Sequence, residues 1–295
     1  MARRSSMSSM GFPPFTYMVK WLIAINCAVF LLMLLGSGLN FLSTGDVYFA
    51  LGLVPKLIVH GWIWQLVTYS FIHAGLWHLL FNMLTLWMFG SQFEMDWGRK
   101  QFLEFYLFCV VGAALTSIFV GYGALAIYQG YQAPLIRSIA GLIVTPTIGA
   151  SGGIFGILLA YGIIYGNREI LLWFVLPVKA KYLVAAFIFI ALVGALGETG
   201  GVANFAHLGG AFFGWVYLRF VPRRGLGFAT TEGYFGIRNR YIKWRRRRAA
   251  RKFEVYMRKQ NQPTNYNEYF DEYGNYRDPN AKKKDNGEGR GPWVN

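Results

Sequence analysis

The sequence has little charge and few cysteines for its length. Only 15% of its 295 residues are charged, whereas a soluble domain carries about 25%. The two cysteines, Cys27 and Cys109, each lie inside an apolar run, so packing is their expected role and no disulfide framework is predicted. No dinucleotide-binding motif, P-loop or metal-ligand spacing is present. The composition therefore excludes an ordinary soluble domain, and neither a cofactor nor a metal is expected.

The charge that is present lies mostly at one end of the chain. Of the 29 Lys and Arg residues, 19 lie at or after Arg219. This asymmetry predicts three parts: a cytoplasmic N-terminal segment (1–15), a membrane domain (16–221) and a basic, disordered cytoplasmic tail (222–295). The polybasic run Trp244–Arg248 closely follows the membrane domain, and such runs bind anionic lipid and set topology more often than they bind nucleic acid. No nucleic-acid partner is expected.

Apolar runs predict an all-α membrane protein with six transmembrane helices. A helix needs about 20 mostly apolar residues to cross a bilayer. The first run is long enough to span, which favours a retained helix over a signal peptide. The first connection, about 37–72, is long and contains Trp62 and Trp64, which predicts that it lies at the membrane interface. The predicted spans are 17–36, 73–93, 102–126, 148–166, 181–198 and 202–221.

The sequence also predicts the conformation of two other connections. The connection at about 127–147 contains Pro134 and Pro146, so an irregular chain is expected. Ile170–Val178 is apolar but too short to span, and it is interpreted as an interfacial or re-entrant piece.

The positive-inside rule orients the predicted bundle. Basic residues flank the start of the first span and occupy the connections after the second and fourth spans. Both termini are therefore expected in the cytoplasm and the first connection on the outer side. The protein is predicted to be an integral, multi-pass membrane protein. Because no transit peptide is evident, a prokaryotic cytoplasmic (inner) membrane is the expected location.

Four polar residues lie at membrane depth, where each needs a partner or water. His78 and Asn82 are four residues apart and share one face of the second span, Ser151 opens the fourth span, and His207 lies near the start of the sixth. All three spans begin on the outer side. At 1.5 Å per residue, these groups are expected within ~8 Å of the outer surface. Scattered core residues would not share a depth in this way.

These residue types together indicate serine catalysis. A serine hydroxyl becomes nucleophilic when a base takes its proton, and an imidazole with a pKa near 6.5 suits that role. Ser151 is therefore the predicted nucleophile and His207 the predicted base. His78, Asn82 and the backbone N–H of Ser151 are the predicted donors to an oxyanion. The small-residue pair Gly210 and Gly214 would pack the sixth span against the fourth.

The motifs then match a known family. His78-Leu-Leu-Phe-Asn82, Gly149-Ala-Ser151-Gly and Ala206-His207-Leu-Gly-Gly210-Ala-Phe-Phe-Gly214 lie in order on the second, fourth and sixth spans. Over residues 15–221 the sequence resembles the rhomboid intramembrane serine proteases. The resemblance implies a six-transmembrane-helix rhomboid-like bundle with a long interfacial first loop.

The resemblance also implies roles for individual residues. Ser151 and His207 would form a dyad with no third acid, with His78 and Asn82 as oxyanion donors. His73 would have a structural, hydrogen-bonding role, and Glu94 would tie the outer loop or helix ends. The implied substrates are single-span membrane proteins, cleaved within or next to their transmembrane helix without a cofactor.

The sequence departs from the family pattern at two positions. Trp64-Gln65 stands where the family commonly has Trp-Arg, so Glu94 would lose a bidentate guanidinium partner and the anchoring of the first loop must differ. Phe155 stands where the family often has Tyr. The expected stacking on His207 survives that change, and any hydroxyl hydrogen bond does not.

Three alternative functions can be weighed against protease activity. A non-catalytic rhomboid-like protein would bind client transmembrane helices, and loss of Ser151 or His207 would mark that class. A transporter or channel would use His78 and His207 as proton-relay groups and would need paired acids, for which Glu104 is the only candidate. A soluble hydrolase with the Gly-x-Ser-x-Gly pattern would need a strand–turn–helix context that these apolar surroundings do not provide.

Overall fold

The computed structural model describes residues 13–130, 134–172, 176–197 and 201–221, together with 225, 239, 241–244, 248 and 255–256. The chain divides into a compact unit, Met1–Leu226, and a second unit, Gly227–Asn295. The predicted disorder of the tail falls largely outside the described residues. The membrane domain and the candidate site lie in the first unit.

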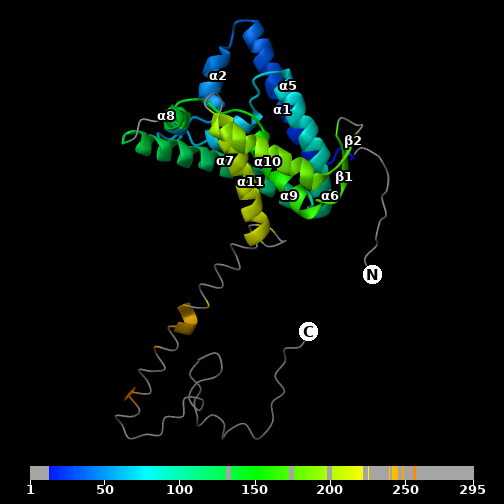
Figure 1. Cartoon of the computed structure of the whole chain (residues 1–295), viewed down its shortest axis with the longest axis vertical. Coiled ribbons are helices and arrows are strands. Elements are labelled where there is room, and N and C mark those ends of the chain that lie inside the picture. The colour runs from blue at the N-terminus through cyan, green and yellow to red at the C-terminus, as the bar shows by residue number, and fades with distance from the viewer. Residues whose placement is uncertain are drawn as a thin grey trace, which may run out of the picture. The chain divides into compact units, whose positions relative to one another are not determined.

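The first unit is built almost entirely from helices (Figure 1). Its elements are α1 (Tyr17–Gly38), α2 (Thr44–Leu51), α3 (Pro55–Ile58), α4 (Gln65–Thr68), the 3-10 helix η1 (Tyr69–Phe71), α5 (Leu76–Thr85), the π-helix η2 (Leu86–Gly90), α6 (Ser91–Trp97), α7 (Arg99–Tyr128), α8 (Pro134–Ala140), the 3-10 helix η3 (Gly141–Ile143), α9 (Ser151–Ile164), β1 (Glu169–Leu172), β2 (Leu176–Lys179), α10 (Ala180–Leu196) and α11 (Gly201–Phe220).

Each predicted span coincides with helix, but the lengths differ. Within the described residues, α1 and α7 are long and apolar enough to cross a membrane. Residues 65–97 would add a third span if the bent pair Gln65–Phe71 and Leu76–Trp97 counts as one; its two parts meet at 101°. The apolar helices α9 and α10 are shorter than the usual span. The helices support an integral membrane protein, and the number six stays a prediction.

The two long connections contain more helix than the sequence suggested. The first connection holds α2, α3 and α4, with Ser43 capping α2 through its hydroxyl. The prediction of an irregular 127–147 connection was wrong in part, because α8 and η3 lie within it. Pro134 is the first residue of α8, a position where its missing N–H breaks no helical hydrogen bond.

The apolar segment after α9 forms an antiparallel hairpin. Strands β1 and β2 pair in the register Glu169↔Lys179, Ile170↔Val178, Leu171↔Pro177 and Leu172↔Leu176. The hairpin satisfies its own backbone groups in a segment too short to span. It follows the C-terminal end of α9, whereas Ser151 opens the other end of that helix.

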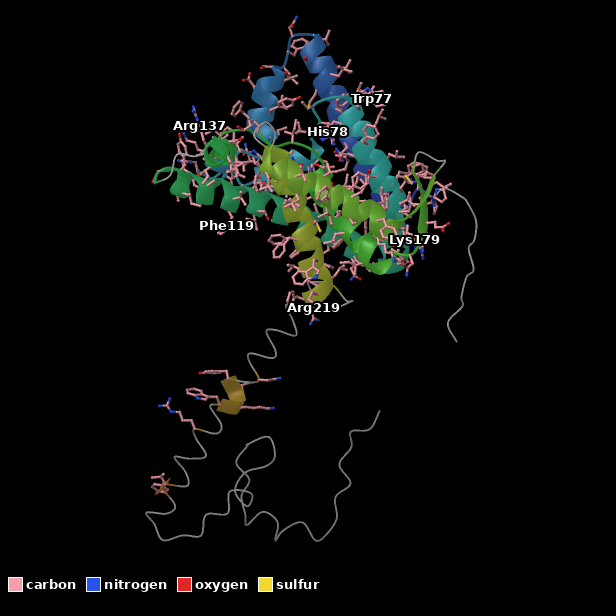
Figure 2. The ribbon with its side chains drawn as sticks, in the orientation of Figure 1. Trp77, His78, Phe119, Arg137, Lys179 and Arg219 are labelled. Carbon is pink, nitrogen blue, oxygen red and sulfur yellow. The ribbon has the colours of Figure 1, made fainter. Side chains whose placement is uncertain are left out.

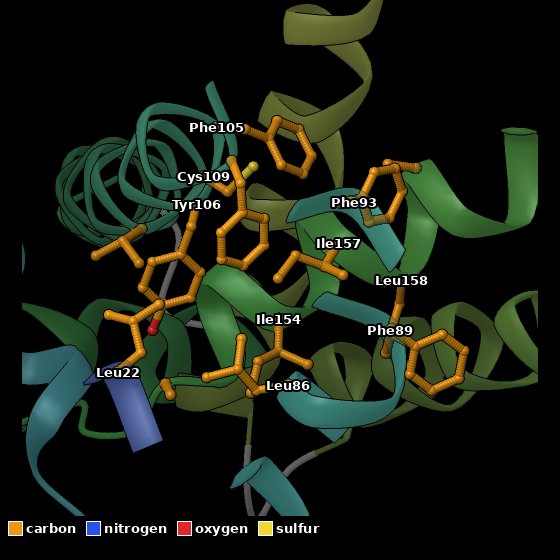
Figure 3. Close-up of a cluster of buried hydrophobic side chains, with 14 of the residues drawn as sticks. Leu22, Leu86, Phe89, Phe93, Phe105, Tyr106, Cys109, Ile154, Ile157 and Leu158 are labelled. Atoms are coloured by element: carbon orange, nitrogen blue, oxygen red, sulfur yellow. The ribbon is translucent and has the colours of Figure 1, made fainter. Parts of the chain in front are cut away.

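The core of the first unit is aromatic and aliphatic (Figure 3). Phe89 and Phe93, from η2 and α6, pack near Phe105 and Tyr106 of α7 and Ile157 of α9. All five side chains are buried. This cluster joins η2 and α6 to α7 and α9.

Helices α9 and α11 approach closely at glycines. A Cβ added to Gly210 would lie 1.8 Å from the carbonyl oxygen of Gly152, and one added to Gly214 would lie 2.9 Å from the Cα of Gly156. Only glycine allows backbones to pass at this distance. The expected packing of the sixth span on the fourth through Gly210 and Gly214 is present in the structure.

Glu94 fixes the start of α1. Its carboxylate accepts the backbone N–H groups of Met18 (2.8 Å) and Val19 (3.0 Å) and the hydroxyl of Thr16 (2.5 Å). A carboxylate at a helix N-terminus satisfies unpaired N–H groups and complements the helix dipole. Glu94 was expected to tie either the outer loop or helix ends. In the structure its hydrogen bonds hold the end of a helix, α1, and not the first loop.

Candidate active site

Ser151 and His207 meet where the first turn of α9 faces α11. The Oγ of Ser151 lies 2.8 Å from Nε2 of His207, within hydrogen-bonding distance. A neutral imidazole that carries its proton on Nδ1 can accept the hydroxyl proton at Nε2. Within the described residues no carboxylate is hydrogen-bonded to His207. The pair therefore has the geometry of a nucleophile and its general base, with no third member.

Phe155 lies one helical turn after Ser151 and faces the same imidazole. The rings of Phe155 and His207 are parallel to within 1°, with centroids 4.3 Å apart. The stacking expected at this position is present although the hydroxyl of a tyrosine is missing. The contact restricts rotation of the imidazole and so helps to keep Nε2 directed at Ser151.

The side chain of His78, which belongs to α5, also lies close to Ser151. A Cβ added to Gly149 would lie 2.7 Å from Nε2 of His78 and 3.5 Å from Oγ of Ser151. Gly149 also has a φ of +121°, a conformation that side-chain-bearing residues rarely adopt. In Figure 2 His78 lies within the bundle, while its neighbour Trp77, 71% exposed, lies at the outer edge. Glycine at 149 thus leaves room for His78 beside Ser151.

Asn82 is the fourth polar residue predicted at the site. Its side chain is buried, and Nδ2 donates to the carbonyl oxygen of His78 at 3.0 Å. One N–H of the amide is therefore used inside α5, and the other is the one that could serve an oxyanion.

His73 lies behind the site, in the turn between η1 and α5. It is 1% exposed, and its ring meets that of His78 edge to face with centroids 5.0 Å apart. Within the described residues neither ring nitrogen of His73 has a hydrogen-bond partner, so the hydrogen-bonding role implied for His73 is not seen, and its contact with His78 is one of packing.

Gln65 is fully buried and bonds within the first connection. Its Oε1 accepts the N–H of Val54 at 3.0 Å and its Nε2 donates to the carbonyl of Phe49 at 2.6 Å. The carboxylate of Glu94 has its own partners at the start of α1. The expectation that a missing guanidinium at position 65 deprives Glu94 of a partner does not fit these contacts, because the two side chains serve separate segments.

Tyr69 was not singled out by the sequence. Its carbonyl oxygen accepts the N–H of Gly149 at 2.9 Å, and its buried hydroxyl donates to the carbonyl of Val110 at 2.8 Å. A Cβ on Gly152 would lie 2.8 Å from that hydroxyl. Tyr69 thereby connects η1 to α7 and to the start of α9. No motif marks it, since its partners are backbone carbonyl and amide groups.

Comparison with known proteins identifies a domain family. Residues 60–224 match the sequence model of the Rhomboid domain. The chain belongs to the rhomboid family. The matched range includes Ser151, His207, His78 and Asn82, and it begins within the first connection.

Curated relatives come from several kinds of organism. Rhomboid protein 1, mitochondrial, of Saccharomyces cerevisiae is 32% identical over 214 residues, which cover 70% of this chain and 55% of that protein. Rhomboid protease GluP of Bacillus subtilis is 29% identical over 209 residues, covering 70% and 34%. Rhomboid protease AarA of Providencia stuartii is 29% identical over 199 residues, covering 65% and 68%. RHOMBOID-like protein 1 of Arabidopsis thaliana is 31% identical over 193 residues, covering 62% and 40%.

The chain spans about half or less of the length of the first relatives, 55% of the yeast protein and 40% of the Arabidopsis protein. The similarity places the chain in the rhomboid family and, with the apolar helices, supports an integral membrane protein. Two of the relatives are named as proteases.

Proposed function

We propose that this rhomboid is an intramembrane serine endopeptidase that cleaves single-span membrane proteins within or next to their transmembrane helix. The observation that carries the proposal is the 2.8 Å contact between Oγ of Ser151 and Nε2 of His207. Ser151 would attack the scissile carbonyl carbon while its proton passes to His207, and His207 would then protonate the leaving amine. Water, deprotonated by His207, would then cleave the ester on Ser151, and the proton would return to Oγ. No cofactor or metal takes part in these steps.

The oxyanion of the tetrahedral intermediate would be held by three groups. These are His78, the amide of Asn82 and the backbone N–H of Ser151, which lies at the first residue of α9. Preorganised donors of this kind contribute about 3 kcal/mol each. The closeness of Nε2 of His78 to Gly149 supports this assignment.

The proposed topology has six spans with both termini in the cytoplasm. Arg99 lies over the ring of Tyr17 at 4.2 Å, and the hydroxyl of Tyr165 donates to Asp96. The starts of α1 and α7 and the ends of α6 and α9 therefore gather at one end of the bundle, with exposed cations such as Arg168. By the positive-inside rule this end faces the cytoplasm, which supports an outer-leaflet position for Ser151.

Two further expectations accompany the proposal. The basic tail is expected to bind anionic lipid, a role that falls mainly on residues outside the described ones. The relatives come from yeast, a plant and bacteria, so a prokaryotic cytoplasmic membrane stays a prediction that rests on the sequence alone.

The alternative is a non-catalytic rhomboid-like protein that binds client transmembrane helices. Such a protein has no use for a base aligned on a serine hydroxyl, and the Ser151–His207 contact therefore favours the protease.

The decisive experiment is cleavage of a model single-span protein in liposomes. Wild type is expected to give product, and Ser151→Ala and His207→Ala are expected to give none above the uncatalysed background. Equal product from wild type and Ser151→Ala would overturn the proposal. Clients bound equally by all three proteins, without cleavage, would favour the binding alternative.

A further inference from the structure

The amide of Gln65 holds one stretch of the first connection from inside. Gln65 is fully buried, and both ends of its amide bond to backbone, with Oε1 accepting from Val54 and Nε2 donating to Phe49. When a buried amide is hydrogen-bonded to backbone groups, the backbone segment that carries those groups has little freedom to move. Trp64 and Thr68 also donate to carbonyls of this stretch, and Gln65 is the one fully buried side chain of the three.

That stretch is bonded in turn to the segment that enters α9. Leu53, next to Val54, donates its N–H to the carbonyl of Thr147 at 2.8 Å, and Thr147 donates back to Leu53 at 2.9 Å. Leu53 is fully buried. These two hydrogen bonds form an isolated antiparallel bridge, and Thr147 lies four residues before Ser151.

A third contact connects Gly149 back to the helical turns that carry Gln65. Gly149 donates its N–H to the carbonyl of Tyr69, and Tyr69 lies four residues after Gln65 along the continuous helical turns α4 and η1. Gln65, Val54, Leu53, Thr147, Gly149 and Tyr69 thus form a closed set of hydrogen-bonded and covalent links, here called the tether ring.

We propose that Gln65 is a positioning residue for the oxyanion site, acting through the tether ring; the proposal rests on the proposed function. The ring holds the chain at Thr147 and at Gly149, on either side of Ile148. Gly149 is the residue against which Nε2 of His78 lies. The ring therefore sets the separation between His78 and the backbone N–H of Ser151, the two donors that come from different helices.

A positioning role and a purely structural role predict different kinetics. Displacement of an oxyanion donor lowers the maximum rate of the chemical step and leaves the binding of the reagent largely unchanged. Loss of fold would instead lower the fraction of active protein and the melting temperature together. Separate measurements of the maximum rate, the half-saturating concentration and the melting temperature distinguish the two roles.

The test uses a fluorescent fluorophosphonate and the full chain in detergent. Oγ of Ser151 forms a bond to phosphorus, fluoride leaves, and the Oγ proton passes to His207. Gln65→Met keeps the length of the side chain and removes the hydrogen bonds of the amide to Val54 and Phe49. We expect its saturating labelling rate to fall about tenfold, with the half-saturating concentration within about twofold of wild type. Gln65→Glu, which full burial keeps protonated, retains an acceptor for Val54 and a donor for Phe49, and is expected to keep at least about a third of the rate.

Thr68→Val is the matched control. Thr68 lies in the same helical turn and donates to the carbonyl of Leu51 at 2.7 Å, but it is only half-buried and lies outside the tether ring. Its labelling rate is expected to stay within about twofold of wild type. If Gln65→Met does not give folded protein, Gln65→Asn, which shortens the side chain by one methylene, replaces it in the same measurements.

A double-mutant cycle with His78→Ala identifies the group on which Gln65 acts. If Gln65 acts by placing His78, Gln65→Met should lower the rate less than about threefold in the His78→Ala background. Equal losses in both backgrounds, or a loss of labelling that follows the melting temperature, would overturn the proposal. Labelling that survives in Ser151→Ala would instead contradict the proposed function, so the two failures are distinguishable.

Discussion

The ring of Phe155 lies flat against the imidazole of His207, parallel to within 1° and 4.3 Å away. The two residues come from different helices, α9 and α11, so the contact depends on how these helices pack. It leaves Nε2 of His207 facing Ser151.

The first prediction concerns Phe155. Phe155→Leu removes the flat surface that restricts the imidazole, and the saturating rate of fluorophosphonate labelling is expected to fall about tenfold. Phe155→Tyr keeps the stacking and should label at close to the wild-type rate. Phe119→Leu is a suitable control, because Phe119 is an exposed aromatic residue of α7. A rate for Phe155→Leu equal to that of Phe119→Leu would contradict the prediction.

The second prediction separates His78 from Asn82. Nε2 of His78 lies beside Gly149, whereas the amide of Asn82 already donates one N–H within α5. His78→Ala is therefore expected to lower the labelling rate about a hundredfold, and Asn82→Ala only about tenfold. Melting temperatures measured in the same detergent check that both variants are folded. A larger loss for Asn82→Ala would reverse the assignment of the main donor.

The third prediction concerns the contact between α9 and α11. Gly210→Ala would place a methyl group 1.8 Å from a backbone oxygen, and overpacking of this kind costs about 1–3 kcal/mol. We expect a lower melting temperature and, because Ser151 and His207 lie on the two displaced helices, slower labelling. Gly123→Ala in α7 is the matched control, since nothing lies within 4 Å of its added Cβ. Its melting temperature should be unchanged or slightly raised.

The fourth prediction concerns Glu94 at the start of α1. Glu94→Gln replaces a carboxylate that accepts from Thr16, Met18 and Val19 with an amide. Because hydrogen bonds to a charged group contribute about 1.5–3 kcal/mol, the variant is expected to melt at a lower temperature.

Labelling of folded Glu94→Gln should remain normal, since Glu94 does not contact Ser151 or His207. Asp46→Asn is the control, because Asp46 is also an acid in the first turn of a helix, α2, but is exposed. Its effect should stay below about 0.5 kcal/mol. Equal melting temperatures for the two variants would show that the Glu94 contacts add no stability.

Some features of this protein could be predicted from the sequence because they depend on local pattern. Low charge and long apolar runs indicate a membrane protein with helices near the observed positions. Gly210 and Gly214 predicted close packing through their spacing alone, and the structure has that packing. The motifs around His78, Ser151 and His207 gave the family, which the match to residues 60–224 confirms.

Other features could not be predicted, because their contacts are made with backbone groups distant in the sequence. Tyr69 and Gln65 bond to backbone amides and carbonyls, which every residue carries and no motif marks. Glu94 caps a helix 76 residues earlier in the chain. Strands β1 and β2 likewise depend on pairing with each other, which apolar composition does not specify.

The sequence by itself predicted the chemistry of the site: a serine, two histidines and an asparagine, expected at one depth in a membrane. The tertiary structure decided that Ser151 and His207 lie at hydrogen-bonding distance. It also decided that the chain is held at Thr147 by Leu53 and at Gly149 by Tyr69. The reason is physical: periodicity fixes the face and depth of a side chain, whereas distances of about 3 Å are fixed only by the packing of helices that the chain brings together from far apart.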